Sequence, residues 1–178
     1  MGRLQTKLSL KARALQWLAQ RDQSRIELRR KLLRHAARLG DEGEAGAEDG
    51  APELRDEVEA VLDWLEAHRY LSAERFAESR IHAREPRFGN LRIKGELARH
   101  GVALSEAAAR ALAESEMQRA AAVRERRFAS APCDAAQRAA QSRFLVARGF
   151  SPEVIHRLMR QMPSPAHGAG TGDPDEAA

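Results

Sequence analysis

Apolar residues recur every three or four positions in several segments of this chain, and polar or Gly- and Pro-containing stretches separate those segments. Leu8, Leu15 and Leu18 form one such series, and Leu28 and Leu32 belong to the next. Residues with this spacing lie on one face of an α-helix. No segment alternates apolar and polar residues as a half-buried strand does. The pattern therefore predicts an all-α fold.

The same criterion predicts further helices along the chain. One begins near Glu53, one follows Ser72, one spans 90–101, one begins at Asp134, and the last begins at Ser151. Residues 105–128 contain neither Gly nor Pro, so they fit either one long helix or two helices with a bend near 115–117. In the helix from Asp134, the expected apolar face is Ala140, Phe144 and Ala147.

Local signals mark several helix ends. The segment 24–27 (Ser-Arg-Ile-Glu) has the form of a capping box, in which Ser24 accepts from a backbone N–H and Glu27 reaches back to another. Ser72 is the expected N-cap of its helix, with Glu74 in the first turn. Gly101 suits a helix end because glycine tolerates the left-handed conformation.

Three helical segments, 24–32, 90–102 and 138–150, look like copies of one unit. Leu97 and Leu145 are 48 residues apart, as are Gly101 and Gly149. The first copy aligns with the second at a spacing of 65, which pairs Leu28, Leu32 and His35 with Ile93, Leu97 and His100. A fixed period of tens of residues is typical of stacked helical units. We therefore predict an elongated tandem array of three three-helix repeats.

The expected division places the first repeat at 1–71, the second at 72–116 and the third at 117–162. A Gly-, Ala- and acid-rich stretch at 40–52 has no apolar periodicity and is predicted to be a flexible acidic loop inserted in the first repeat. The Pro- and Gly-rich segment 163–178 is predicted to be a disordered tail.

Charge is distributed unevenly along the 178 residues. The formal net charge is +4, but residues 1–39 carry eleven Lys and Arg against two acidic residues, a net charge of +9. Residues 40–57 carry a net charge of −7 and residues 163–178 a net charge of −3. The predicted helical part is thus more basic than the total, which favours an anionic partner.

Catalytic and metal-binding motifs are missing from the sequence. The six His residues show no metal-ligand spacing, no phosphate-binding Gly-rich motif occurs, and the single Cys133 has no partner for an internal disulfide. We expect no enzymatic activity, no metal and no cofactor. No apolar run is long enough to cross a membrane and the N-terminus lacks the features of a signal peptide, so a cytoplasmic protein is expected.

Four motifs follow one another over residues 10–160. They lie at 14–32, which ends in Glu27-Leu-Arg-Arg-Lys-Leu32, at 61–79, which contains Tyr70-Leu-Ser72, at 87–102, and at 144–151. In this order and spacing they resemble the RecX family of bacterial recombination regulators. The chain departs from the family's pattern in the 40–52 insertion and in Ala73, where the family often has Asp.

The resemblance implies a monomeric protein that binds the RecA recombinase along the groove of the RecA–DNA filament. It implies inhibition of ATP hydrolysis, strand exchange and coprotease activity, and hence a role in homologous recombination, DNA repair and the SOS response. An elongated basic array fits such a groove. Weak direct binding to DNA is a further expectation.

Two sets of basic residues are candidates for contact with the partner or with nucleic acid. Arg30, Arg34 and Arg38 recur every four residues on one helix face, and the second set is Arg87, Arg92, Lys94 and Arg99. Either set could instead be an ordinary solvated helix face, and this reading is favoured for Arg143 and Arg148. Trp17 and Trp64 could stack on bases, but their position in apolar stripes favours packing in the core.

Two other functions remain open. The chain could be a helical DNA-binding protein that acts through its basic face without RecA, with Asn90 and Arg92 as candidate base-reading residues at a helix start. It could also be a helical scaffold for another protein. The acidic 40–52 insertion could be a neutral addition, or it could mimic DNA charge or screen the first repeat.

Overall fold

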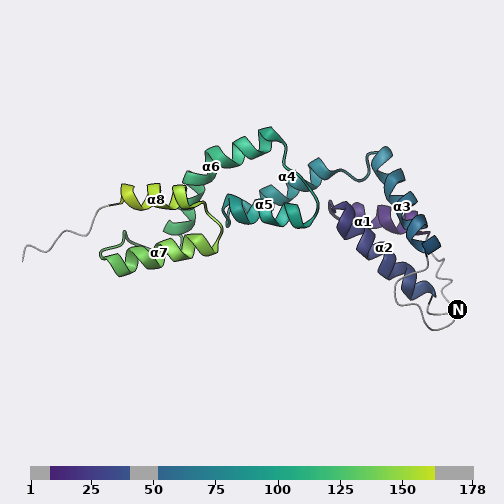
Figure 1. Ribbon diagram of the computed structural model, residues 1–178, viewed down its shortest axis with the longest axis horizontal. Helices are drawn as coiled ribbons and strands as arrows, with labels where there is room; N and C mark the ends of the chain where they lie inside the picture. The colour runs from purple at the N-terminus through teal and green to yellow at the C-terminus, as the bar shows by residue number, and fades with distance from the viewer. Residues whose placement is uncertain (1–8, 41–51, 163–178) are drawn as a thin grey trace, which may run out of the picture. The chain divides into compact units, whose positions relative to one another are not determined.

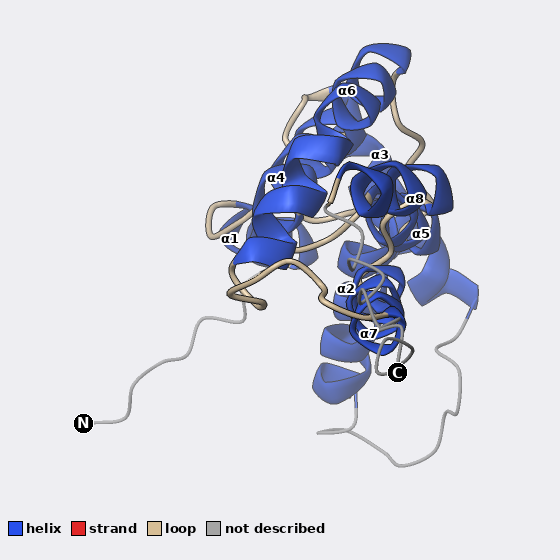
Figure 2. Cartoon of the chain, turned by 90° about the vertical axis from the view of Figure 1, so that its left-hand side faces the viewer, coloured by secondary structure: helices blue, strands red, loops and turns tan. Residues whose placement is uncertain are grey.

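The computed structural model of the chain describes residues 9–40 and 52–162, and every regular element within them is a helix (Figure 1, Figure 2). The helices are α1 Leu10–Leu18, α2 Arg25–Gly40, α3 Pro52–Ala67, α4 Ala73–Arg84, α5 Asn90–Arg99, α6 Glu106–Glu125, α7 Ala135–Ala147 and α8 Pro152–Gln161. The predicted all-α fold is confirmed. Residues 41–51 of the predicted acidic loop and the predicted tail 163–178 lie outside the described residues.

Residues 106–125 form one continuous helix, which decides between the two readings of that segment. Helix α6 passes through the position where a bend was considered, and Ser115 there donates its hydroxyl to the Ala111 carbonyl at 2.9 Å. A serine can make this bond without interrupting the helix. The long Ala-rich segment therefore behaves as its high helix propensity predicts.

The helix starts follow the predicted caps with one exception. The Ser24 hydroxyl accepts from the Glu27 N–H at 3.1 Å, and Ser72 accepts from the Arg75 N–H at 3.2 Å. The second half of the predicted capping box is wrong. The Glu27 carboxylate pairs with Arg21 at 3.1 Å and Arg80 at 3.5 Å instead of returning to its cap. Charged guanidinium donors compete better for a carboxylate than a neutral amide does.

Three helices end in the same way, with a residue in the left-handed conformation four positions after a buried leucine. Gly101 (φ 67°) follows Leu97, and Gly149 (φ 79°) follows Leu145. Arg69 (φ 60°) occupies this place after Leu65. In each case the leucine carbonyl accepts from the N–H five residues later, at 2.9 to 3.2 Å. This is the usual way to satisfy carbonyls at a helix end.

The helices belong to two compact units. The first unit comprises Met1–Ala83 and Lys94–Ala109, and the second comprises Arg84–Ile93 and Arg110–Ala178. The core of the first unit joins α1, α2 and α3. It consists of Leu10, Ala14, Leu28, Leu32, Ala36, Val58, Leu62, Leu65 and Leu71, with Trp17 and Trp64 packed against it. The predicted apolar faces of α2 and α3 are thus the ones that are buried.

In the second unit, the core joins α6, α7 and α8. It consists of Ala120, Val123, Leu145, Phe150, Ile155, Leu158 and Met159. The predicted inner face of α7 is wrong, because Ala140 and Ala147 are exposed. Gln141 is buried in their place, where its side-chain oxygen accepts from Arg124 Nε at 2.7 Å. A satisfied buried polar pair moved the inward face of this helix.

Each unit contains a junction between the start of one helix and the corner at the end of another. In the first unit, the Ser24 hydroxyl at the start of α2 lies 3.2 Å from His100 Nδ1 at the end of α5. In the second, the Gly89 N–H before α5 donates to the Arg148 carbonyl after α7 at 3.0 Å. Ser24 and Gly89 are 65 residues apart, and His100 and Arg148 are 48 apart. The two contacts therefore join positions that the sequence spacings relate.

Candidate functional site

The basic stripe on α2 is available to a partner. Arg30, Arg34 and Arg38 are all exposed, and none of the three has a hydrogen bond or ion pair to another described residue. The opposite side of the helix is buried through Leu28 and Leu32. The core therefore fixes this helix while three guanidinium groups remain in solvent.

Other arginines on α2 are neutralised by α3. Arg25 donates to Glu59 at 2.6 Å and to Asp63 and Glu66 at 2.7 Å each. Arg29 pairs with Glu59 as well. Burial by itself lowers the pKa of Arg25, but the hydrogen bonds to Asp63 and Glu59 raise it further above its ordinary value. The basic residues of α2 thus divide into a structural set and an unpaired set.

The two tryptophans pack within the protein, as predicted. Both are partly buried against the core of the first unit. Trp17 lies edge-on to His35, with ring centroids 5.8 Å apart, and Trp64 stacks on His68 at 4.1 Å. Lys11 Nζ also lies 3.0 Å from the centre of the Trp64 ring. The protein's own side chains therefore cover these rings against stacking on bases.

The second candidate set is exposed but is divided between the units. Arg87 and Arg92 belong to the second unit, and Lys94 and Arg99 belong to the first. Arg92 lies over the Phe88 ring at 4.4 Å. The structure thus brings Arg87 and Arg92 together near one aromatic ring, within the same compact unit.

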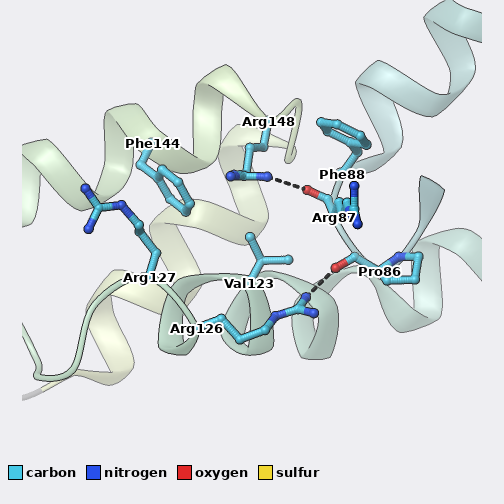
Figure 3. A pocket seen from close by; sticks show the side chains of 8 residues that line it. All are labelled: Pro86, Arg87, Phe88, Val123, Arg126, Arg127, Phe144 and Arg148. Atoms are coloured by element: carbon cyan, nitrogen blue, oxygen red, sulfur yellow. Dashed lines mark hydrogen bonds between the residues drawn. The ribbon is translucent and has the colours of Figure 1, made fainter.

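A cavity of about 400 Å³ in the second unit is the most distinctive basic site in the described residues (Figure 3). It is lined by Pro86, Arg87, Phe88, Val123, Arg126, Arg127, Phe144 and Arg148. None of the four lining arginines forms an ion pair with a carboxylate in the described part of the chain. The volume lies within the range of sites that bind small ligands.

The side chains of the cavity arrange charge around an apolar floor. In Figure 3, Val123 lies at the centre, with Phe144 and Phe88 on opposite sides. Arg148 lies over the Phe144 ring at 4.5 Å and donates to the Arg87 carbonyl at 3.3 Å. A guanidinium over a ring face is held by attraction to the ring's quadrupole.

Main-chain contacts fix the 86–90 loop that forms one wall of the cavity. Arg126 donates to the Pro86 carbonyl, and Arg119 donates to the Phe88 carbonyl at 2.8 Å. Burial lowers the pKa of Arg119, the largest influence on it, although Glu116 and Glu85 act in the opposite sense. The guanidinium group stays charged at physiological pH. These bonds give the wall a defined position.

A buried carboxylate ties the same loop to α8. Glu116 Oε1 accepts from the Asn90 N–H at 2.9 Å and from the Ser151 N–H at 3.1 Å. Its other oxygen accepts from the Ser151 hydroxyl at 2.9 Å. One side chain of α6 therefore satisfies N–H groups at the starts of both α5 and α8.

Sequence reasoning missed most of this cavity. Arg126 and Arg127 were not singled out, and Arg148 was interpreted as a solvated residue. Their convergence depends on the fold, because Pro86 and Phe144 are 58 residues apart in the chain. Only Arg87 of the lining had been predicted as a contact residue.

The described residues hold no group of His, Cys, Asp and Glu side chains arranged to bind a metal ion. Cys133 is exposed and has a free thiol. Among the helices of the described part of the chain, none has the length and apolar character to span a membrane.

Comparison with known proteins identifies related sequences. Residues 114–159 match the family model described as RecX, third three-helix domain. The chain is 50% identical over 156 residues to Regulatory protein RecX of Ralstonia nicotianae, covering 86% of this chain and 87% of that protein. It is 46% identical over 157 residues to Regulatory protein RecX of Herbaspirillum seropedicae, covering 86% and 88%.

A solved structure is similar in fold. The crystal structure of RecX from Lactobacillus salivarius superposes with a TM-score of 0.62 at 18% sequence identity, covering 85% of this chain and 93% of that one.

Proposed function

Since this chain belongs to the RecX family of regulatory proteins, we propose that it binds the RecA–DNA filament and inhibits RecA's ATPase, strand-exchange and coprotease activities. The observation that carries the proposal is the 50% identity, over most of both chains, to a protein named Regulatory protein RecX. The protein acts in the cytoplasm as a monomer, in recombination, repair and the SOS response. It has no catalytic activity or cofactor of its own.

The unpaired basic residues support a role in binding this anionic assembly. On α2, Arg30, Arg34 and Arg38 contact the filament or its DNA phosphates, because their charges have no internal partner. The second contact set is Arg87, Arg92, Lys94 and Arg99. The three repeats proposed from the sequence, 1–71, 72–116 and 117–162, each contribute one such helix pair to an extended contact.

Binding across neighbouring RecA subunits accounts for inhibition without chemistry. A protein that bridges subunits blocks further subunit addition or holds an arrangement that does not hydrolyse ATP. Binding one arrangement more tightly than another is sufficient to shift the equilibrium between them.

ATP hydrolysis by the cognate RecA on single-stranded DNA, titrated with this protein, tests the proposal. We expect inhibition at well below one molecule per RecA subunit. The variant Arg30→Ala/Arg34→Ala/Arg38→Ala should inhibit less. Its charge-matched control is Arg110→Ala/Arg143→Ala/Arg157→Ala, which removes three other exposed arginines. Unchanged ATPase at saturating protein would refute the proposal.

The second candidate function is DNA binding through the basic face without RecA. The same arginines favour it, but the structure removes one candidate base-reading residue. Asn90 is buried, and its amide donates to the Leu112 carbonyl at 3.0 Å. Tight duplex binding with strong sequence preference, in the absence of RecA inhibition, would support this alternative.

A further inference from the structure

We infer that the arginine- and phenylalanine-lined cavity of the second unit binds one nucleotide of a single DNA strand. Its phosphates lie on the guanidinium groups and its sugar and base lie against the apolar floor. The inference goes beyond the proposed function, because it concerns bare DNA and requires no interaction with RecA.

The charge of the cavity selects a ligand with several negative charges. Four arginines line about 400 Å³, and none is neutralised by a carboxylate of the described chain. Two of them, Arg126 and Arg148, use part of their donor capacity on loop carbonyls. Arg87 and Arg127 are exposed and make no side-chain hydrogen bond to a described residue. Their forked donors match the oxygens of consecutive phosphates.

The apolar floor distinguishes a nucleotide from inorganic phosphate. Val123, Phe88 and Phe144 offer no hydrogen-bonding side chain, and a free phosphate gains nothing from them. A sugar or base does gain from this surface. The arginines over the rings, Arg92 and Arg148, extend the platform, since a guanidinium plane itself stacks on bases.

The same features favour a single strand over a duplex. In a duplex the bases are paired and stacked, so only phosphates reach a cavity of this kind. Contact with Phe88 or Phe144 requires an unstacked base. An acidic protein segment is the other possible occupant, but side-chain carboxylates do not bring a flat ring beside every charge as nucleotides do.

Binding of the full-length protein to a short fluorescein-labelled oligothymidylate, followed by fluorescence anisotropy over a range of salt concentrations, tests the inference. The variant Arg87→Ala/Arg127→Ala should weaken binding at least about tenfold. The slope of log K against log salt should fall by roughly 0.7 for each lost phosphate contact. The control Arg110→Ala/Arg143→Ala removes two exposed arginines of the same unit that lie outside the cavity lining, and it should lose much less.

The variant Phe88→Leu separates the floor from the charges. It should weaken oligothymidylate binding several-fold and leave the salt slope unchanged, because stacking releases no counterions. Thermal unfolding of each variant checks that the fold is retained. If that unfolding shows the double variant to be misfolded, Phe88→Leu and the single variant Arg87→Ala carry the test.

Three outcomes would overturn the assignment. The first is an equal loss in the cavity variant and its control, which would mean unspecific charge attraction. The second is unchanged oligothymidylate binding in the cavity variant together with lost binding of a polyglutamate peptide, which would mean an acidic protein partner. The third is a Phe88→Leu variant that binds as the wild type. Because the assay contains no RecA, its failure is separate from failure of the ATPase test.

Discussion

The backbone N–H of Gly89 donates to the carbonyl of Arg148 at 3.0 Å, and the neighbouring Leu91 N–H donates to Gly149 at the same distance. These two bonds join the start of α5 to the corner between α7 and α8. The approach is so close that a β-carbon added at Gly89 would lie 2.3 Å from the Gly149 carbonyl oxygen. The junction is therefore made by main-chain atoms in direct contact.

Gly89→Ala should destabilise the protein strongly. The added methyl group meets backbone atoms of Gly149 and Phe150 at 2.3 Å, and backbone cannot move aside as a side chain can. We expect a loss of about 3 kcal/mol in the free energy of unfolding, measured by urea denaturation. Gly95→Ala is the control, because no atom lies within 4 Å of its added β-carbon. Replacing this glycine inside α5 should stabilise by about 0.5–1 kcal/mol.

Arg69→Gly should stabilise the protein. Arg69 occupies the left-handed position that Gly101 and Gly149 fill at the ends of their helices. An L-residue other than glycine is strained there, so glycine should raise the free energy of unfolding by roughly 0.5 kcal/mol after its own entropic cost. Arg69→Val should lower it by about 1 kcal/mol, since β-branched residues fit this region worst. A lower Tm for the glycine variant than for wild type would contradict the assignment of strain.

Glu116→Ala should be among the most damaging changes in the second unit. It leaves the N–H groups of Asn90 and Ser151 without their acceptor in a buried place. We expect a loss of roughly 2–4 kcal/mol by chemical denaturation. Glu114→Ala, an exposed position on the same helix, is the control and should change stability little. The cavity should also bind oligothymidylate less well in Glu116→Ala, because Asn90 ends the loop that forms one cavity wall.

Acidification should remove the contribution of Glu27. Burial alone raises the pKa of this carboxyl, but the hydrogen bond and charge of Arg21, with the charges of His100 and Arg80, hold it below its ordinary 4.5. A folded-state pKa below the unfolded one gives stability that is present above the unfolded pKa and lost as pH falls through the folded one. Glu27→Gln should therefore cost roughly 1 kcal/mol near neutral pH.

The pH dependence distinguishes this pair from a general charge effect. Below the pKa of the folded carboxyl, wild type and Glu27→Gln should unfold with the same free energy. Glu57→Gln, at an exposed carboxylate on α3, should show no such difference at any pH. A gap between wild type and Glu27→Gln that persists in strong acid would mean that packing, not ionisation, is responsible.

Much of the fold could be predicted from the sequence, because helical periodicity and capping are local properties. The spacing of Leu28 and Leu32 located the buried face of α2, and Ser72 located the start of α4. The inner face of α7 could not be predicted in this way. Gln141 is buried because Arg124 reaches it from another helix, and no local pattern reports that pairing.

The candidate site was less accessible to sequence reasoning than the fold. A stripe such as Arg30, Arg34 and Arg38 follows from one helical period, so its exposure could be foreseen. The cavity arginines come from the 86–90 loop, the end of α6 and the corner after α7. Their convergence depends on how these three segments pack. Arg148 in particular looked like one more solvated charge until Phe144 and the Arg87 carbonyl were seen to hold it.

The junction built from main-chain atoms has a consequence for how this protein can change over generations. Every backbone carries the same N–H and C=O groups, so the bonds from Gly89 and Leu91 to the α7–α8 corner depend on the space that the two glycines leave free and hardly on neighbouring side chains. Surrounding positions such as Leu91, which is 57% exposed, are free to vary. New partner preferences can thus arise on this surface while the joint beneath it is inherited intact.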